Sequence, residues 1–143
     1  MATASTVERS VSASERPKGL RVLLVEDYAD GAASMAMLLR MSGHDVRVAG
    51  DGASALDEAL QVPPDVVFLD IGLPGGMDGY EVAKRLRKHT AEKRPLLVAV
   101  TGFASEADRR HSFEVGIDLH LAKPADPHNL LGLLRRFQSI IDG

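Results

Sequence analysis

Residues 20–27 read LRVLLVED, in which four consecutive apolar side chains at 22–25 are followed directly by two carboxylates. Two later segments have the same form, VVFLD at 66–70 and LLVAVT at 96–101. Short apolar runs of this kind are typical of strands that are covered on both faces, as in a parallel sheet. These three segments therefore predict the central strands of an α/β sheet.

Two further segments alternate between apolar and polar residues, VRVA at 46–49 and LHLA at 119–122. Alternation predicts strands with one wetter face, so we expect these two at the edges of the sheet. Helical stretches separate the strands, and the β-α unit repeats five times from about Leu20 to Ile141. Five such units with short right-handed crossovers form a doubly wound α/β sheet with helices on both faces.

The helical stretches carry their own start and stop signals. Gly43 follows the first helix, where a left-handed C-terminal residue is easiest for glycine. Three pairs fit helix starts, namely Asp78 with Glu81, Ser105 with Asp108, and Asp126 with Pro127. In the last helix the apolar spacing of three to four predicts one stripe that faces the sheet, formed by Leu130, Leu134, Phe137 and Ile141.

The chain has 143 residues, a formal net charge of −3 and no cysteine. This length fits one domain, which we place at residues 20–142 after a disordered leader at 1–19 that is rich in Ser, Ala and charge. The absence of cysteine excludes a disulfide framework and a thiolate metal site. The slightly acidic balance does not favour direct nucleic-acid binding. No apolar stretch approaches the roughly 18 residues needed to span a bilayer, so we expect no membrane partner.

Polar residues stand at or just past the ends of four strands: Glu26 with Asp27, then Asp70, Thr101 and Lys123. In an open α/β sheet these carboxyl ends converge on one crevice, so the five side chains are expected to be neighbours. Mg²⁺ prefers oxygen ligands and takes one or two carboxylates together with phosphate oxygens. Three carboxylates, one hydroxyl and one ammonium in one pocket therefore predict a site for a divalent cation and a phosphoryl group.

Each of these residues also has a structural explanation when it is taken alone. An acidic pair is favoured at a helix start by the helix dipole, and Asp70 is a turn former before Gly72. Thr101 is a β-branched residue at a strand end, and Lys123 is a solvated surface lysine. Their joint order and their common placement at strand ends favour the functional interpretation.

The motifs LLVED, VVFLD, AVTG and LAKP closely resemble the receiver domain of two-component response regulators, over everything beyond the leader. The resemblance implies a flavodoxin-like (βα)5 fold with strand order 2-1-3-4-5. It also implies that Asp70 is the phosphoacceptor, and that Lys123 precedes a cis bond to Pro124. Thr101 and Lys123 would sense the phosphoryl group, and position 120 would be the moving switch residue.

The resemblance further implies Mg²⁺ as the cofactor, with the metal site formed by Glu26, Asp27, Asp70 and the backbone carbonyl of Gly72. The partners would be a histidine kinase or a histidine phosphotransfer protein, and a downstream protein contacted by the last strand and the helices on either side of it. Such a domain is a cytoplasmic signalling module and not an enzyme in its own right. A homodimer formed on phosphorylation, and a stand-alone chain against a piece of a hybrid kinase or longer regulator, both stay open.

The chain departs from the family pattern at two positions. His120 stands where Tyr or Phe is commoner, and its charge could couple the switch to pH near neutrality, although a half-exposed inert histidine is the simpler explanation. Gly75 and Gly76 make the loop after Asp70 one residue longer than usual, which is either harmless or alters the access of water to a phosphorylated Asp70.

Three alternative functions of the same fold require other residues or fewer of these residues. A flavodoxin needs a hydroxyl- and glycine-rich phosphate loop after the first strand, where this chain has Glu26, Asp27 and Asp30. A haloacid-dehalogenase-like phosphatase needs a second acid two residues beyond its nucleophile, where this chain has Gly72. A phosphorylation-independent interaction module would not need all five site residues.

Overall fold

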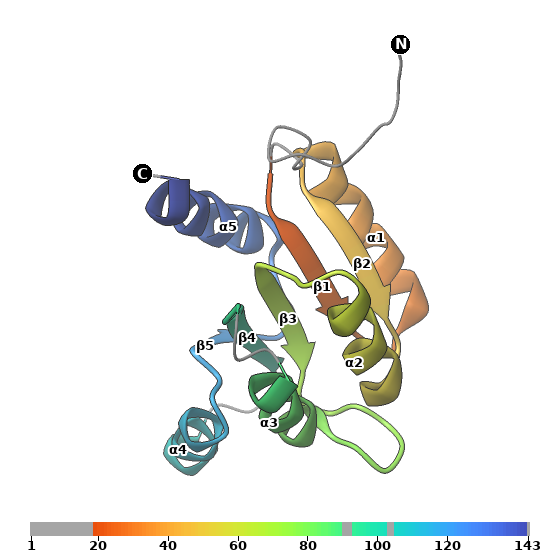
Figure 1. Cartoon of the computed structure of the whole chain (residues 1–143), viewed down its shortest axis with the longest axis vertical. Helices are drawn as coiled ribbons and strands as arrows, with labels where there is room; N and C mark the ends of the chain where they lie inside the picture. Colours follow the sequence, from red (N-terminus) through yellow and green to blue (C-terminus); the bar gives the residue numbers. More distant parts are fainter. Residues whose placement is uncertain (1–18, 90–92, 103–104, 143) are drawn as a thin grey trace.

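The computed structural model describes residues 19–89, 93–102 and 105–142. The leader predicted from the sequence lies outside these residues except for Gly19. Strands and helices alternate along the chain (Figure 1): β1 Arg21–Val25, α1 Ala29–Met41, β2 Asp45–Ala49, α2 Gly52–Gln61, β3 Val66–Asp70, α3 Gly79–His89, β4 Leu96–Thr101, α4 Glu106–Glu114, β5 Leu119–Ala122 and α5 Pro127–Asp142. None of the helices in the described residues is long and apolar enough to cross a membrane.

The five strands form one parallel sheet in the order β2-β1-β3-β4-β5, which confirms the predicted order and both predicted edge strands. Every residue of β3 is buried, as a central strand covered on both faces requires. One core cluster packs the sheet against α1 and α5, and the other packs it against α2 and α3. Figure 1 shows α2 and α3 together in front of the sheet.

The predicted helix starts are confirmed by side-chain hydrogen bonds. The backbone N–H of Glu81 donates to Asp78 Oδ1 at 2.9 Å, and that of Asp108 donates to Ser105 Oγ at 3.1 Å. The N–H of His128 donates to the Asp126 carboxylate in the same way at the start of α5. Each bond satisfies a donor that the first turn of a helix leaves without an intrahelical partner.

Two further predictions about helices, the residue after α1 and the apolar stripe of α5, have different outcomes. Gly43 has φ +97°, so the left-handed residue expected after α1 is confirmed. The apolar stripe of α5 is only partly right, because Leu130 and Leu134 are buried and Phe137 packs on the core, whereas Ile141 is 44% exposed. Leu133 is buried beside Leu134 in its place, so α5 packs through its first three turns and its last turn runs past the core.

The outer edge of β2 is protected by a side chain of α1. The Arg40 guanidinium donates from Nη2 to the backbone carbonyl of Val46 at 2.6 Å. An exposed strand edge is a template for pairing with other chains, and a charged side chain placed over it is one of the ways in which proteins prevent such pairing. Arg40 therefore both satisfies an edge carbonyl and places a charge at the open side of the sheet.

Arg87, in the last turn of α3, joins three segments at the amino ends of β4 and β5. The polar residues of the predicted site lie at the other end of these strands. The Arg87 guanidinium donates to the carbonyl oxygens of Gly116 and Pro95 at 2.9 and 2.7 Å and to Asp118 Oδ2 at 2.6 Å. Asp118 Oδ2 also accepts the backbone N–H of Leu97 at 2.9 Å. Because both side chains are mostly buried, this cluster holds α3, β4 and the turn before β5 in one arrangement.

We expect Arg87→Ala to lower the free energy of unfolding by about 2–4 kcal/mol, because it removes three hydrogen bonds and leaves a partly buried carboxylate without its main partner. Arg85→Ala is the matched control, since Arg85 lies on the same helix and makes an exposed ion pair with Glu81 at 2.8 Å. Urea denaturation of both variants measures the difference. Equal losses in the two variants would show that Arg87 has no special structural role.

Candidate functional site

The polar residues predicted to converge do so at the carboxyl edge of the sheet. Asp70 ends β3 and pairs in register with Val100, the residue before Thr101 on β4. Thr101 pairs with Ala122 of β5, directly before Lys123. Because β1, β3, β4 and β5 are successive strands of the parallel sheet, their ends place all of these residues around one crevice.

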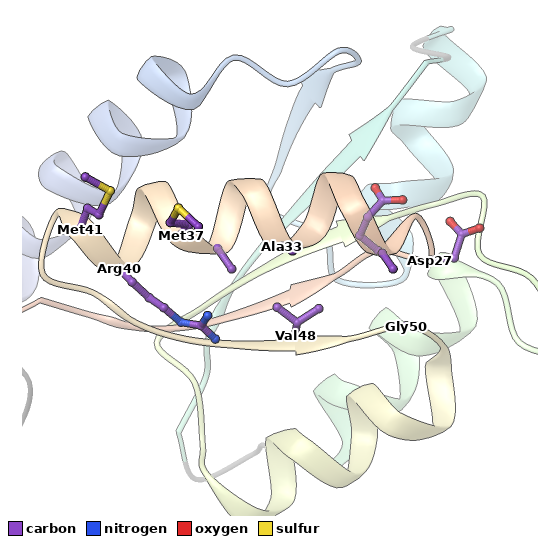
Figure 2. A pocket seen from close by; sticks show the side chains of 10 residues that line it. Asp27, Ala33, Met37, Arg40, Met41, Val48 and Gly50 are labelled. Atoms are coloured by element: carbon purple, nitrogen blue, oxygen red, sulfur yellow. The ribbon is translucent and has the colours of Figure 1, made fainter.

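Three carboxylates form the acidic part of the crevice. Glu26, Asp27 and Asp70 each offer an oxygen atom, and these atoms all lie within 4.8 Å of one another. Asp70 is buried, Glu26 is partly buried and Asp27 is exposed, so the cluster runs from the end of the sheet outward to solvent. Figure 2 shows Asp27 at the end of α1 that faces this edge.

Lys123 supplies the positive charge that faces the carboxylates. Its Nζ lies 3.0 Å from Asp70 Oδ2 and 3.8 Å from Glu26 Oε2. The residue before proline is restricted to extended backbone, which directs Lys123 across the ends of the strands. The Lys123–Pro124 bond is cis, as the family resemblance implies, and the Lys123 N–H donates to the carbonyl of Thr101 at 3.0 Å.

Burial and the neighbouring charges shift the pKa values of two side chains in the crevice. Burial raises the pKa of Glu26, a hydrogen bond from the backbone of Tyr28 lowers it, and the nearby charge of Asp70 adds to the increase, so the net shift is upward. Burial lowers the pKa of Lys123, but the hydrogen bond and charge of Asp70, with the charges of Glu26 and Asp27, outweigh burial and raise it. The raised pKa holds the Lys123 ammonium in its charged form. This single positive charge faces three carboxylates.

Backbone groups fix two of the carboxylates. The N–H of Gly72 donates to Asp70 Oδ1 at 3.0 Å, and the N–H of Tyr28 donates to Glu26 Oε1 at 3.1 Å. Gly79, the first residue of α3, packs so closely on this turn that a Cβ there would lie 2.7 Å from the carbonyl oxygen of Asp70. This contact was not predicted from the sequence, although a glycine directly after the capping residue Asp78 was a signal for it.

The loop between β3 and α3 contains the two glycines predicted to form an insertion. Gly75 has φ +89°, a backbone conformation that favours glycine, and a Cβ on Gly76 would meet nothing within 4 Å. The loop is closed at its base by the N–H of Gly79, which donates to the carbonyl of Ile71 at 3.0 Å. The Gly75–Gly76 segment therefore projects from a fixed base.

His120 lies on β5 opposite Ala99, three residues before Lys123 of the crevice. Within residues 19–89, 93–102 and 105–142, neither ring nitrogen has a hydrogen-bond partner, and both are shielded from solvent. Burial lowers the pKa of His120, the positive charge of Arg109 lowers it further, and Asp108 opposes the shift. The ring is thus in its neutral form at neutral pH.

The oxygen-only donor set of the crevice suits a hard divalent cation. Carboxylate oxygens are the ligands that Mg²⁺ prefers, and it binds through one or two of them while it keeps several waters. The partly exposed cluster leaves room for such waters. Three negative charges facing one ammonium also leave an unbalanced negative charge that a cation would offset.

The family model of the response regulator receiver domain matches residues 22–135. This chain belongs to that family. The receiver domain is a signalling module of two-component systems, and the family predicted from the four motifs is confirmed.

Two curated relatives are similar in sequence to most of this chain. Sensory transduction protein RegX3 of Mycolicibacterium smegmatis is 40% identical over 114 residues, which are 80% of this chain and 48% of that protein. Probable histidine kinase 2 of Oryza sativa subsp. indica is 33% identical over 134 residues, which are 82% of this chain and 13% of that protein. The chain thus spans less than half the length of these curated relatives.

The solved structures match the chain over most of its length. Chemotaxis protein CheY4 of Vibrio cholerae has a TM-score of 0.76 at 30% identity and covers 82% of this chain and 97% of its own. A CheY-like receiver domain protein of Methanospirillum hungatei has a TM-score of 0.76 at 26% identity. These matches confirm the flavodoxin-like fold with five parallel strands.

We expect Mg²⁺ to raise the midpoint of thermal unfolding of this protein, because a ligand that binds only the folded state stabilises it. Asp27→Asn should abolish most of this increase. The same substitution removes part of the repulsion among the acids, so without Mg²⁺ the variant should be at least as stable as the wild type. Asp57→Asn, on the exposed surface of α2, is the matched control and should keep the full response. An unchanged response in Asp27→Asn would contradict the metal site.

Proposed function

We propose that this receiver domain is a phosphoacceptor in a two-component or phosphorelay system, with Asp70 as the residue that is phosphorylated. The supporting observation is the buried Asp70 carboxylate at the centre of the crevice, 3.0 Å from Lys123 and accepting the N–H of Gly72. A carboxylate can act as a nucleophile toward phosphorus, and this one is already oriented by two donors.

In the proposed reaction an Asp70 oxygen attacks the phosphorus of a phosphohistidine on the partner protein. A P–O bond forms while the P–N bond breaks, and the electron pair of the broken bond returns to the imidazole. The product is an aspartyl phosphate, which water can later hydrolyse to phosphate and free Asp70. Lys123 lies next to the attacking carboxylate and offsets the charge on the transferred oxygens, so catalysis is mainly positioning and electrostatics.

Mg²⁺ is the proposed cofactor: Asp27, Asp70 and the backbone carbonyl of Gly72 would hold it, and Glu26 would orient one of its waters. When bound, the ion neutralises negative charge on the phosphoryl oxygens. The crowding of Glu26, Asp27 and Asp70 supports this assignment, because the three carboxylates repel one another and a bound cation would offset that repulsion.

The proposed output is a change in the face formed by α4, β5 and α5, through Thr101, Lys123 and His120. Thr101 would move toward the new phosphoryl oxygens, and the His120 ring would adjust beside it. Ser112 is the one buried residue of α4, so this helix is weakly anchored. Large apolar side chains are exposed on the same elements, which suits a protein partner: Phe113 at 80%, Leu119 at 43% and Ile140 at 74%.

The proposed partners are a histidine kinase or a histidine phosphotransfer protein, which donates the phosphoryl group, and a downstream protein target. The domain would catalyse at most its own phosphorylation and dephosphorylation, and it would act in the cytoplasm without direct contact to nucleic acid. The response regulator family supports these assignments. Dimerisation through α4, β5 and α5 would be a second use of the same face.

We expect intact-protein mass spectrometry to show the gain of one phosphoryl group after incubation with acetyl phosphate and Mg²⁺. Asp70→Asn should show no gain, and Lys123→Ala should slow it strongly, because charge compensation beside the nucleophile is lost. Asp57→Asn is the control for the loss of one surface carboxylate and should be phosphorylated normally. A wild-type protein that stays unmodified, and behaves like Asp70→Asn, would instead support a phosphorylation-independent interaction module.

We expect the free energy of unfolding to fall as the pH falls below about 6.5, the ordinary pKa of histidine, because the folded state holds His120 neutral while the unfolded state takes up the proton. His120→Phe should flatten part of this pH dependence. Arg109 and Asp108 on α4 are the charged groups that act on the ring, and the substitution leaves both unchanged. Identical pH profiles for the two proteins would show that His120 does not titrate differently on folding.

A further inference from the structure

An open groove of ≈ 730 Å³ lies between α1 and the edge strand β2 (Figure 2). Apolar residues in this groove are exposed to solvent, with Met37 at 61%, Met41 at 77% and Val48 at 39%. Ala29 and Ala33 of α1 line the same groove and are exposed as well. Contiguous exposed apolar surface marks an interaction site, and methionine side chains adapt to the shape of a partner. The groove is therefore a surface that a protein can cover.

The two halves of the groove differ in the size of their side chains. The small-residue half, next to the crevice, has Ala29, Ala33 and Gly50, and a Cβ on Gly50 would meet nothing within 4 Å. The methionine half, at the other end of α1, has Met37 and Met41 (Figure 2). From Ala29 to Met41 the helix rises about 18 Å. One half thus leaves space, and the other half carries long side chains that can enter such a space.

The two halves also carry opposite charges. Arg40 lies in the methionine half, and Glu26 and Asp27 lie at the end of the small-residue half (Figure 2). Glu26 is paired with Lys123 at 3.8 Å, whereas neither Arg40 nor Asp27 forms an ion pair within the part of the chain that the structure describes. The Arg40 guanidinium donates from Nη2 to the carbonyl of Val46, and its other N–H groups can serve a second acceptor.

A second copy of the chain, turned end to end, matches this groove in both shape and charge. A two-fold axis over the middle of the groove places Met37 and Met41 of one copy over the small-residue half of the other, and Arg40 of one copy opposite Asp27 of the other. Each contact is then made twice, as in every isologous interface. We propose that this chain forms a two-fold dimer through the groove between α1 and β2, in which the methionines fill the small-residue half and Arg40 pairs with Asp27.

This interface goes beyond phosphoacceptor function and uses a different part of the fold. The groove adjoins β2, whereas the face of α4, β5 and α5 lies at the opposite edge of the sheet. Because Arg40 covers the Val46 carbonyl at the outer edge of β2, the two copies meet through side chains and not by pairing of strands. The groove is short, so we expect a weak and reversible dimer at the small end of the range of interface sizes.

Sedimentation equilibrium of the full unphosphorylated chain without Mg²⁺ tests the proposal. We expect a monomer–dimer equilibrium at chain concentrations up to about 1 mM, and added NaCl should weaken the dimer because it screens the pair of Arg40 and Asp27. A monomer at every concentration would overturn the proposal in favour of a different protein partner for the groove. Because no phosphoryl donor is present, this failure is distinct from a failure of Asp70 phosphorylation.

A charge exchange tests the two-fold arrangement itself. Arg40→Glu and Asp27→Lys should each weaken their own dimer at least about tenfold, because like charges then face each other at both contacts. An equimolar mixture of the two variants should dimerise like the wild type, since both contacts regain opposite charges. Asp57→Lys, on the exposed surface of α2, is the matched control and should not rescue Arg40→Glu. A mixture that stays monomeric, or an equal rescue by Asp57→Lys, would overturn the arrangement.

A substitution in the methionine half decides the question if Arg40→Glu does not fold. Met37→Gln should weaken the dimer at least about tenfold, because the lost apolar contact occurs twice. Leu38→Gln is the matched control on the same helix, since Leu38 is 40% exposed and lies about 140° around the helix from Ala33. Phe113→Gln, on α4, should also dimerise like the wild type. An equal loss in Leu38→Gln, or a loss in Phe113→Gln alone, would overturn the proposed interface.

Discussion

The crowding of three carboxylates at the carboxyl edge of the sheet is the constraint on which the functional architecture depends. At 4.8 Å two like charges repel by about 3 kcal/mol at an effective dielectric constant of about 20. Lys123 offsets part of this repulsion through Asp70 and Glu26, and its raised pKa reflects the same interaction seen from the ammonium. The remaining negative charge supports the proposal that the crevice binds a cation, and it would link metal binding to the proposed phosphoryl transfer.

The rest of the fold supplies a firm base beneath this crevice and a looser side next to it. β3 is buried along its whole length, and Asp70 is held at its end by Gly72. At the other end of the strands, Arg87 and Asp118 hold α3, β4 and the approach to β5 together. By contrast, α4 buries little more than Ser112. In the proposed switch, a change at the fixed site would be transmitted through this less buried helix.

The two sides of α1 differ in a way that matters for binding. On the side of β2, a groove of ≈ 730 Å³ runs along the helix past Met37 and Val48, and Arg40 bonds to the strand edge within it (Figure 2). On the side of α5, a hollow of ≈ 370 Å³ lies next to Lys123 and Asp70. Both hollows reach the crevice, since the groove on the β2 side is also lined by Glu26 and Asp27.

The sequence by itself determined the order of elements, the two edge strands, the helix starts at Asp78, Ser105 and Asp126, and the five polar residues of the crevice, because apolar periodicity and capping act over a few residues of chain. Tertiary structure alone decided that Ile141 lies outside the core while Leu133 is inside it, that Arg87 meets Asp118 across 31 positions of sequence, and that both nitrogens of His120 are shielded without a partner. These features depend on how far each helix extends over the sheet and on which distant side chains then touch, and no local pattern of residues contains that information.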